Sequence, residues 1–89
     1  MKIVYTLHAL EKFKVLEAEG WKITKNKIRQ IIKKPKWQGT TKSNQETAMS
    51  LVDEKHIIRI VLRKENQEGD IIRVITFHIG RRGKYETTL

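Results

Sequence analysis

The fold is decided by residues 56–79, which read HIIRIVLRKENQEGDIIRVITFHI. Two stretches rich in isoleucine and valine, His56–Lys64 and Asp70–Ile79, flank a polar loop at Asn66 to Gly69. β-Branched residues favour strands, and a loop this short joins neighbouring strands only in an antiparallel arrangement. The pattern therefore predicts a hairpin, and a further strand is expected before it at Glu46–Val52.

Two helices are predicted upstream of these strands. Thr6 is a plausible N-cap for a helix over residues 7–19, and Gly20 stands where a left-handed residue would end that helix. Thr24 is a second N-cap, and Pro35 ends the helix that follows it.

This order predicts one α+β domain spanning residues 1–89. We expect two N-terminal helices packed on one face of a three- to four-stranded antiparallel sheet whose other face is open. Residues 36–44 are expected to form an exposed loop. Residues 3–5 form either a short edge strand or an arm, and residues 81–88 form either a last strand or a tail.

Three arginines, Arg59, Arg63 and Arg73, interrupt the apolar strands. If odd-numbered residues of the hairpin pair with odd-numbered residues, these side chains share the face away from the helices. The other register would bury Arg73, which is costly for an unpaired guanidinium. On a shared face the arginines could bind phosphate groups. The alternative is cross-strand ion pairing with Glu46, Glu65 or Asp70.

Composition narrows the classes of function. The chain has no cysteine, which excludes disulfides and thiolate chemistry, and it has no apolar run of membrane-spanning length. Because no apolar signal segment opens the sequence, a cytoplasmic location is expected. Nineteen Lys and Arg against ten Asp and Glu give a net charge of +9. The partner should therefore be acidic, and RNA fits best.

The basic residues concentrate around the second predicted helix, where residues 22–36 contain no acidic residue. Trp21 and Trp37 lie at its two ends and would either stack on bases or anchor the core. The helix itself presents either an RNA-binding face or an ordinary solvated lysine face. The residues expected to bind RNA are Lys12, Lys22, Lys25, Lys27, Arg29, Lys33, Lys34, Arg63, Arg73 and Arg82.

Several short motifs occur in a characteristic order. The run Tyr5-Thr6-Leu7-His8-Ala9-Leu10-Glu11-Lys12 is followed by Lys34-Pro35, then by Arg59-Ile60-Val61-Leu62 and Val74-Ile75-Thr76. Over nearly the whole chain this order resembles the family called domain of unknown function 4258. That family is similar to the RelE and BrnT ribonuclease toxins, which cut RNA without metal and are inhibited by an antitoxin. The closing Gly80-Arg81-Arg82-Gly83-Lys84-Tyr85 is also similar to the basic end of RelE-like chains.

The resemblance implies a RelE-like fold and a metal-independent endoribonuclease that needs no cofactor. The resemblance implies that the functional residues of this chain are His8, Arg59, Arg81 and Tyr85. It also implies two partners, RNA and an acidic antitoxin-like protein. Lys12 stands where the family usually has arginine.

RNA cleavage without metal needs a base for the 2′-hydroxyl, a cation for the phosphorane and an acid for the leaving oxygen. His8 can exchange protons near neutral pH, and Lys12 lies one turn along the same helix face. His8 could equally cap or pack near the helix start. Tyr85 either stacks on a base or tethers the tail. His56 and His78 are interpreted as ordinary strand residues.

The leading hypothesis is therefore a toxin-like ribonuclease. Two other classes stay open: a non-catalytic nucleic-acid-binding module, and a protein-interaction domain whose basic face binds an acidic partner.

The charge predicts RNA binding that weakens steeply with salt. If about 4–6 phosphates are neutralised, a log–log plot of affinity against salt has a slope of about −3 to −5. The measurement is a titration of labelled single-stranded RNA across salt concentrations. Absence of binding at about 50 mM salt and micromolar protein would contradict it.

Overall fold

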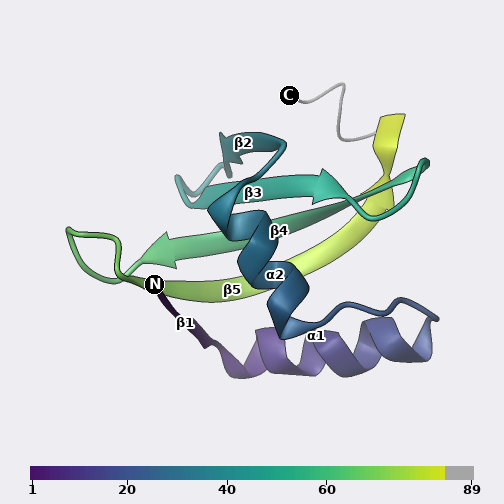
Figure 1. Cartoon of the computed structure of the whole chain (residues 1–89), viewed down its shortest axis with the longest axis horizontal. Helices are drawn as coiled ribbons and strands as arrows, with labels where there is room; N and C mark the ends of the chain where they lie inside the picture. The colour runs from purple at the N-terminus through teal and green to yellow at the C-terminus, as the bar shows by residue number, and fades with distance from the viewer. Residues whose placement is uncertain (84–89) are drawn as a thin grey trace.

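A computed structural model describes residues 1–83 of the chain, and its strands form one five-stranded mixed sheet in the order β1-β5-β4-β3-β2 (Figure 1). The helices are α1 (Leu7–Ala18) and α2 (Lys25–Lys33). The strands are β1 (Lys2–Tyr5), β2 (Trp37–Thr40), β3 (Glu46–Leu51), β4 (His56–Lys64) and β5 (Ile71–Arg81). Figure 1 shows α2 crossing the sheet and α1 lying along β5.

The predicted fold class, a RelE-like antiparallel sheet of three to four strands, is wrong. β1 is an edge strand that pairs with β5 in parallel, with Lys2 opposite Ile71 and Tyr5 opposite Val74. Parallel pairing is open to β1 because both helices and three strands separate it from β5, so no tight turn dictates the opposite direction.

The loop predicted at residues 36–44 is also corrected, because Trp37–Thr40 forms β2 and pairs antiparallel with β3. Gln38, Gly39 and Thr40 are all exposed, so this edge strand lacks the alternation that marks a half-buried strand. This strand therefore forms through backbone pairing with β3 and not through a side-chain pattern that the sequence could reveal.

The helix boundaries follow the predicted caps. The Thr6 hydroxyl accepts a hydrogen bond from the Ala9 amide at 3.0 Å, and the Thr24 hydroxyl accepts one from the Lys27 amide at 3.0 Å. Gly20, with φ at +94°, adopts the left-handed conformation expected after α1. Neither helix of residues 1–83 is long and apolar enough to cross a membrane.

Both helices contribute to one core on one face of the sheet. Ala9 and Leu16 of α1 and Ile28 and Ile31 of α2 are buried there. Leu7, the first residue of α1, is 74% exposed, because the helix packs through the small Ala9 instead. The sheet residues in this core are Ala48, Ile58, Ile60, Leu62, Ile72, Val74 and Phe77.

A β-bulge interrupts the pairing of β4 with β5. Val61 is opposite Thr76, but the next residue, Leu62, is opposite Val74, so Ile75 is an extra residue in β5. Because side chains alternate along a strand, the insertion reverses which residues of β5 face the helices. Phe77 consequently enters the core, where its ring centroid lies 4.8 Å from that of Phe13.

The bulge also gives the arginines a register that neither predicted pairing includes. Arg63 is opposite Arg73, which is odd with odd, whereas Arg59 on the other side of the bulge is opposite His78. All three arginines lie on the face opposite the helices, which we call the second face. This face is not open at its centre, because Thr47, Met49, Ile57 and Val61 are each at most 5% exposed.

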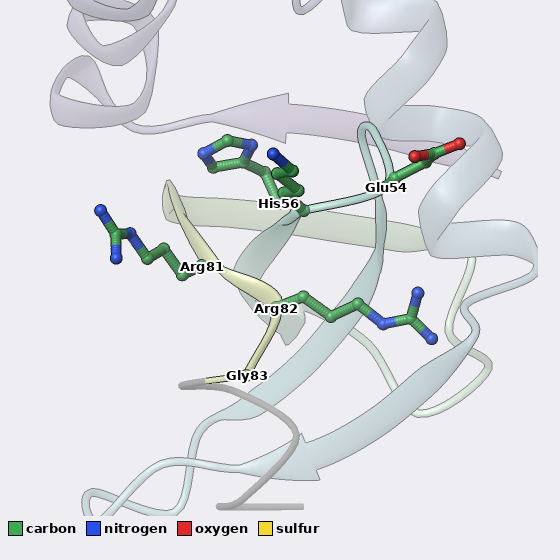
Figure 2. Close-up of a pocket in the computed structure, with 6 residues that line it drawn as sticks. Glu54, His56, Arg81, Arg82 and Gly83 are labelled. Atoms are coloured by element: carbon green, nitrogen blue, oxygen red, sulfur yellow. The ribbon is translucent and has the colours of Figure 1, made fainter.

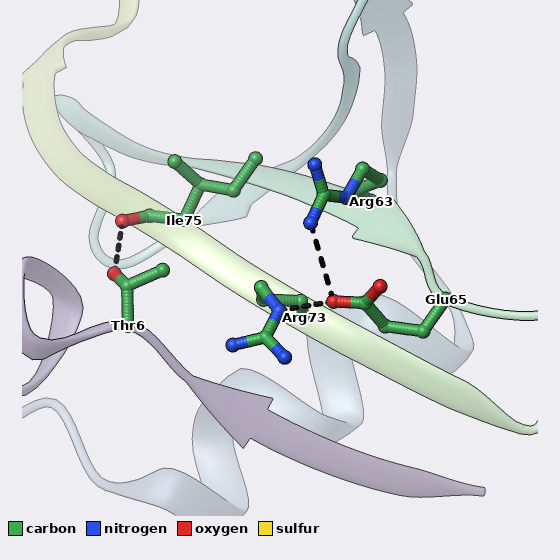
Figure 3. A network of polar contacts seen from close by, with 5 residues as sticks. All are labelled: Thr6, Arg63, Glu65, Arg73 and Ile75. Carbon is green, nitrogen blue, oxygen red and sulfur yellow. Dashed lines mark hydrogen bonds and ion pairs between the residues drawn. The ribbon is translucent and has the colours of Figure 1, made fainter.

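Thr6 connects α1 to the bulge. Its hydroxyl donates a hydrogen bond to the Ile75 carbonyl at 2.7 Å, in addition to capping the helix (Figure 3). Thr24 caps α2 without such a second bond.

We expect Thr6→Ala to destabilise the fold more than Thr24→Ala. Loss of a cap costs about 1 kcal/mol, and loss of the bond to Ile75 adds about 1 kcal/mol for Thr6. Urea unfolding of both variants measures the difference. Equal losses of unfolding free energy would contradict the anchoring role of Thr6.

Candidate functional site

A row of side chains crosses the second face at Arg59. Trp37 of β2 is opposite Met49 of β3, Met49 is opposite Arg59 of β4, and Arg59 is opposite His78 of β5. Directly opposed residues of neighbouring strands share a face. This row, which we call the Arg59 row, therefore places an aromatic ring, a guanidinium and an imidazole on one surface.

Helix α1 packs along β5 and carries two more candidate side chains. His8 lies in its first turn and Lys12 one turn later, so both occupy the same side of the helix. Ala9 and Leu16 face the core beside them. The hydrogen bond from Thr6 to Ile75 attaches the start of α1 to β5. His8 follows Thr6 by two residues, so its backbone lies close to this attachment point.

His78 stands in a positively charged and partly buried environment. Burial lowers the pKa of His78 below its usual value, and the positive charges of Lys12, Arg59 and His8 lower it further. Arg59 is opposite His78 in the ladder, and Thr6, which begins α1, is bonded to Ile75 three residues before His78, so α1 starts beside the β5 end of the Arg59 row. The structure thus brings together two residues predicted from sequence and adds a histidine interpreted as ordinary. The sequence did contain a signal for the position of His78. If the large Phe77 side chain is buried in the core, the next residue of the strand must face the opposite side of the sheet.

Arg59 differs from the other two arginines of the second face. Arg73 Nε donates to Glu65 Oε1, and Arg63 Nη2 lies 3.4 Å from the same oxygen (Figure 3). The hydrogen bond from Arg73, aided by Arg63 and opposed by burial, holds the pKa of Glu65 below its usual range. The ion-pair alternative therefore holds for both. Among residues 1–83, Arg59 has no hydrogen-bond or ion-pair partner.

Arg81 does not join this site. It is opposite His56, whose ring packs on Trp21 at 4.9 Å on the helix side of the sheet, so the sheet separates Arg81 from Arg59. Arg81 instead lines a cavity of about 610 Å³ with Glu54, Lys55, His56, Arg82 and Gly83. Figure 2 shows Arg81 and Arg82 pointing in opposite directions. Tyr85, the remaining matched position, lies outside the described residues.

The basic residues around α2 lie on the helix side, away from the Arg59 row. Arg29 Nη1 donates to the Met1 carbonyl at 2.9 Å, and Lys25 Nζ lies 5.3 Å from the centroid of the Tyr5 ring. No ion pair with an acidic residue is formed, within the described part of the chain, by Lys22, Lys25, Lys27, Arg29, Lys33 or Lys34. The predicted RNA-binding set is therefore divided between two sides of the molecule.

The two tryptophans are divided in the same way. Trp21 packs against the core, which agrees with an anchoring role. Trp37 is partly buried on the second face, and Lys36 Nζ lies 5.0 Å from the centroid of its ring. Only Trp37 can therefore present a ring beside the Arg59 row.

Within residues 1–83, no three His, Asp or Glu side chains are grouped so that they could hold a metal ion. Comparisons of this chain with protein-family models, curated proteins and solved structures find no match.

We expect Arg59→Gln to weaken RNA binding more than Arg73→Gln. Arg59 has no hydrogen-bond or ion-pair partner among residues 1–83, whereas the charge of Arg73 is already paired with Glu65. Loss of one charge-assisted contact of about 1.5 kcal/mol raises the Kd roughly tenfold, and the Arg73 variant should change it by less than about twofold. Fluorescence anisotropy with labelled single-stranded RNA measures both. A larger effect at Arg73 would contradict this assignment.

Proposed function

We propose that this chain is a ribonuclease that cleaves single-stranded RNA without a metal ion. The observation that carries the proposal is the pairing of Arg59 with His78 across β4 and β5, beside the helix that carries His8 and Lys12 and that Thr6 attaches at Ile75. A phosphodiester bound there would contact groups able to exchange protons and groups able to neutralise charge.

The chemistry divides among these side chains. Arg59 projects from the middle of a rigid strand and has no competing partner among residues 1–83, so its guanidinium would stabilise the phosphorane oxygens. Lys12 would hold the same phosphate from the helix side. His8 is exposed in the first turn of α1 and would exchange a proton with the reacting oxygens.

RNA beyond the scissile phosphate would follow the Arg59 row toward Trp37, on which an adjacent base could stack. The basic face of α2 would act by long-range attraction, since it lies on the other side of the sheet. The resemblance to domain of unknown function 4258 and to the RelE and BrnT ribonucleases supports this proposal at His8 and Arg59. Its RelE-like fold is not part of the proposal.

We propose that the chain has a second partner besides RNA, an acidic, antitoxin-like protein that covers this basic surface. We also propose that the protein is located in the cytoplasm. The motive is the net charge of +9 together with the resemblance. A neighbouring short gene with an acidic product would support this partner. Co-expression of that product should then inhibit cleavage.

The function is tested by single-turnover cleavage of mixed-sequence RNA in EDTA. We expect wild-type protein to cleave, and His8→Ala and Arg59→Ala each to lower the rate by about 10²-fold, because each removes proton transfer or charge stabilisation. Lys14→Gln is the matched control, since Lys14 is exposed on the side of α1 away from Lys12.

Binding measured in parallel separates the alternatives. RNA binding without cleavage in the wild type would favour the non-catalytic module. Equal cleavage by all four proteins would show that the activity arises elsewhere.

A further inference from the structure

The cluster described above contains one imidazole that the sequence did not single out. His78 is opposite Arg59 in the β4–β5 ladder and is partly buried, and α1, which carries His8 and Lys12, is attached at Ile75 and packs along β5. The bulge at Ile75 is what turns His78 onto the second face, since the same insertion directs Phe77 into the core. Bulges commonly occur next to active sites, where they redirect one side chain.

We infer that His78 is the general base of this site, taking the proton from the 2′-hydroxyl of the substrate, while His8 acts as the general acid and donates a proton to the leaving 5′-oxygen. This inference rests on the proposed ribonuclease function and assigns the acid and the base within it.

The 2′-oxygen loses its proton to His78 and forms a bond to phosphorus, and the bond between phosphorus and the 5′-oxygen breaks as that oxygen takes the proton from His8. Arg59 and Lys12 neutralise the phosphorane oxygens meanwhile. The products are a 2′,3′-cyclic phosphate and a 5′-hydroxyl end.

The surroundings of His78 suit a base. Arg59 of β4 and Lys12 and His8 of α1 are the charged groups acting on it, and all three disfavour a second positive charge. Burial has the same effect and is the largest cause of the lowered pKa. At neutral pH the imidazole is therefore unprotonated and able to accept a proton.

The test is the pH dependence of single-turnover cleavage in EDTA, using wild type, His78→Gln, Lys12→Gln and two controls. His56→Gln is the control for His78, because His56 lies on the helix side of the same hairpin, and Lys14→Gln is the control for Lys12. We expect His78→Gln to lower the rate by about 10²-fold with RNA affinity unchanged. The controls should retain the wild-type rate.

The acidic limb of the wild-type profile should reflect protonation of His78 and be lost in His78→Gln. Lys12→Gln removes a positive charge near His78, so the pKa of His78 rises and the acidic limb moves to higher pH. NMR titration of the His78 ring protons gives a readout independent of activity, because the midpoint of His78 should rise in Lys12→Gln. Circular dichroism confirms that each variant is folded.

The outcomes separate the two proposals. If wild type cleaves and His78→Gln cleaves at the same rate, the assignment of His78 is overturned while the ribonuclease function stands. If the acidic limb of Lys12→Gln does not move upward, the base is not His78. If wild type cleaves no RNA, both proposals fail.

Discussion

The arrangement of this protein depends on one extra residue in β5. The bulge at Ile75 reverses the alternation of the strand, so that Ile72 and Val74 face the helices before it and Phe77 faces them after it. Without the bulge, the residues with even numbers would continue to face the core, and Phe77 would face away from Phe13. The burial of Phe77 at 0% exposure favours the bulged register, and the same register places His78 beside Arg59.

The bulge acts on α1 as well. The hydroxyl of Thr6 caps the helix and also bonds to the carbonyl of Ile75, so the first turn of α1 is attached where β5 changes its alternation. β1 pairs with β5 only as far as Val74, and this leaves the rest of β5 for the helix to pack along. The backbone determines how the candidate site is assembled. The pairing of β4 with β5 positions Arg59 and His78, and the attachment of α1 to Ile75 positions His8 and Lys12.

Charge is distributed so that few cations remain available beside the Arg59 row. Glu65 pairs with both Arg63 and Arg73, and the basic residues of α2 lie across the sheet. A net charge of +9 therefore overstates the positive charge at the candidate site. The specific chemistry rests on Arg59 and Lys12, and the remaining basic residues contribute mainly a long-range field that attracts an anionic partner.

The sequence by itself determined the features that local rules govern. The helix ends are marked by Thr6, Gly20, Thr24 and Pro35, and stretches rich in isoleucine and valine mark β4 and β5, because caps and side-chain patterns act over a few residues. It also indicated His8, Lys12 and Arg59 as candidates.

Only the tertiary structure decided the two edge strands, the parallel pairing of β1 and the register at Ile75. These depend on which distant segments pack together, since a strand at an edge carries little side-chain pattern and a bulge forms only where packing on both sides of it requires one. For the same reason the separation of Arg81 from Arg59 and the place of His78 beside Arg59 could not be predicted from the order of residues alone. Pairing of Arg73 with Glu65 was one of the alternatives that the sequence offered, and only the structure decided in its favour.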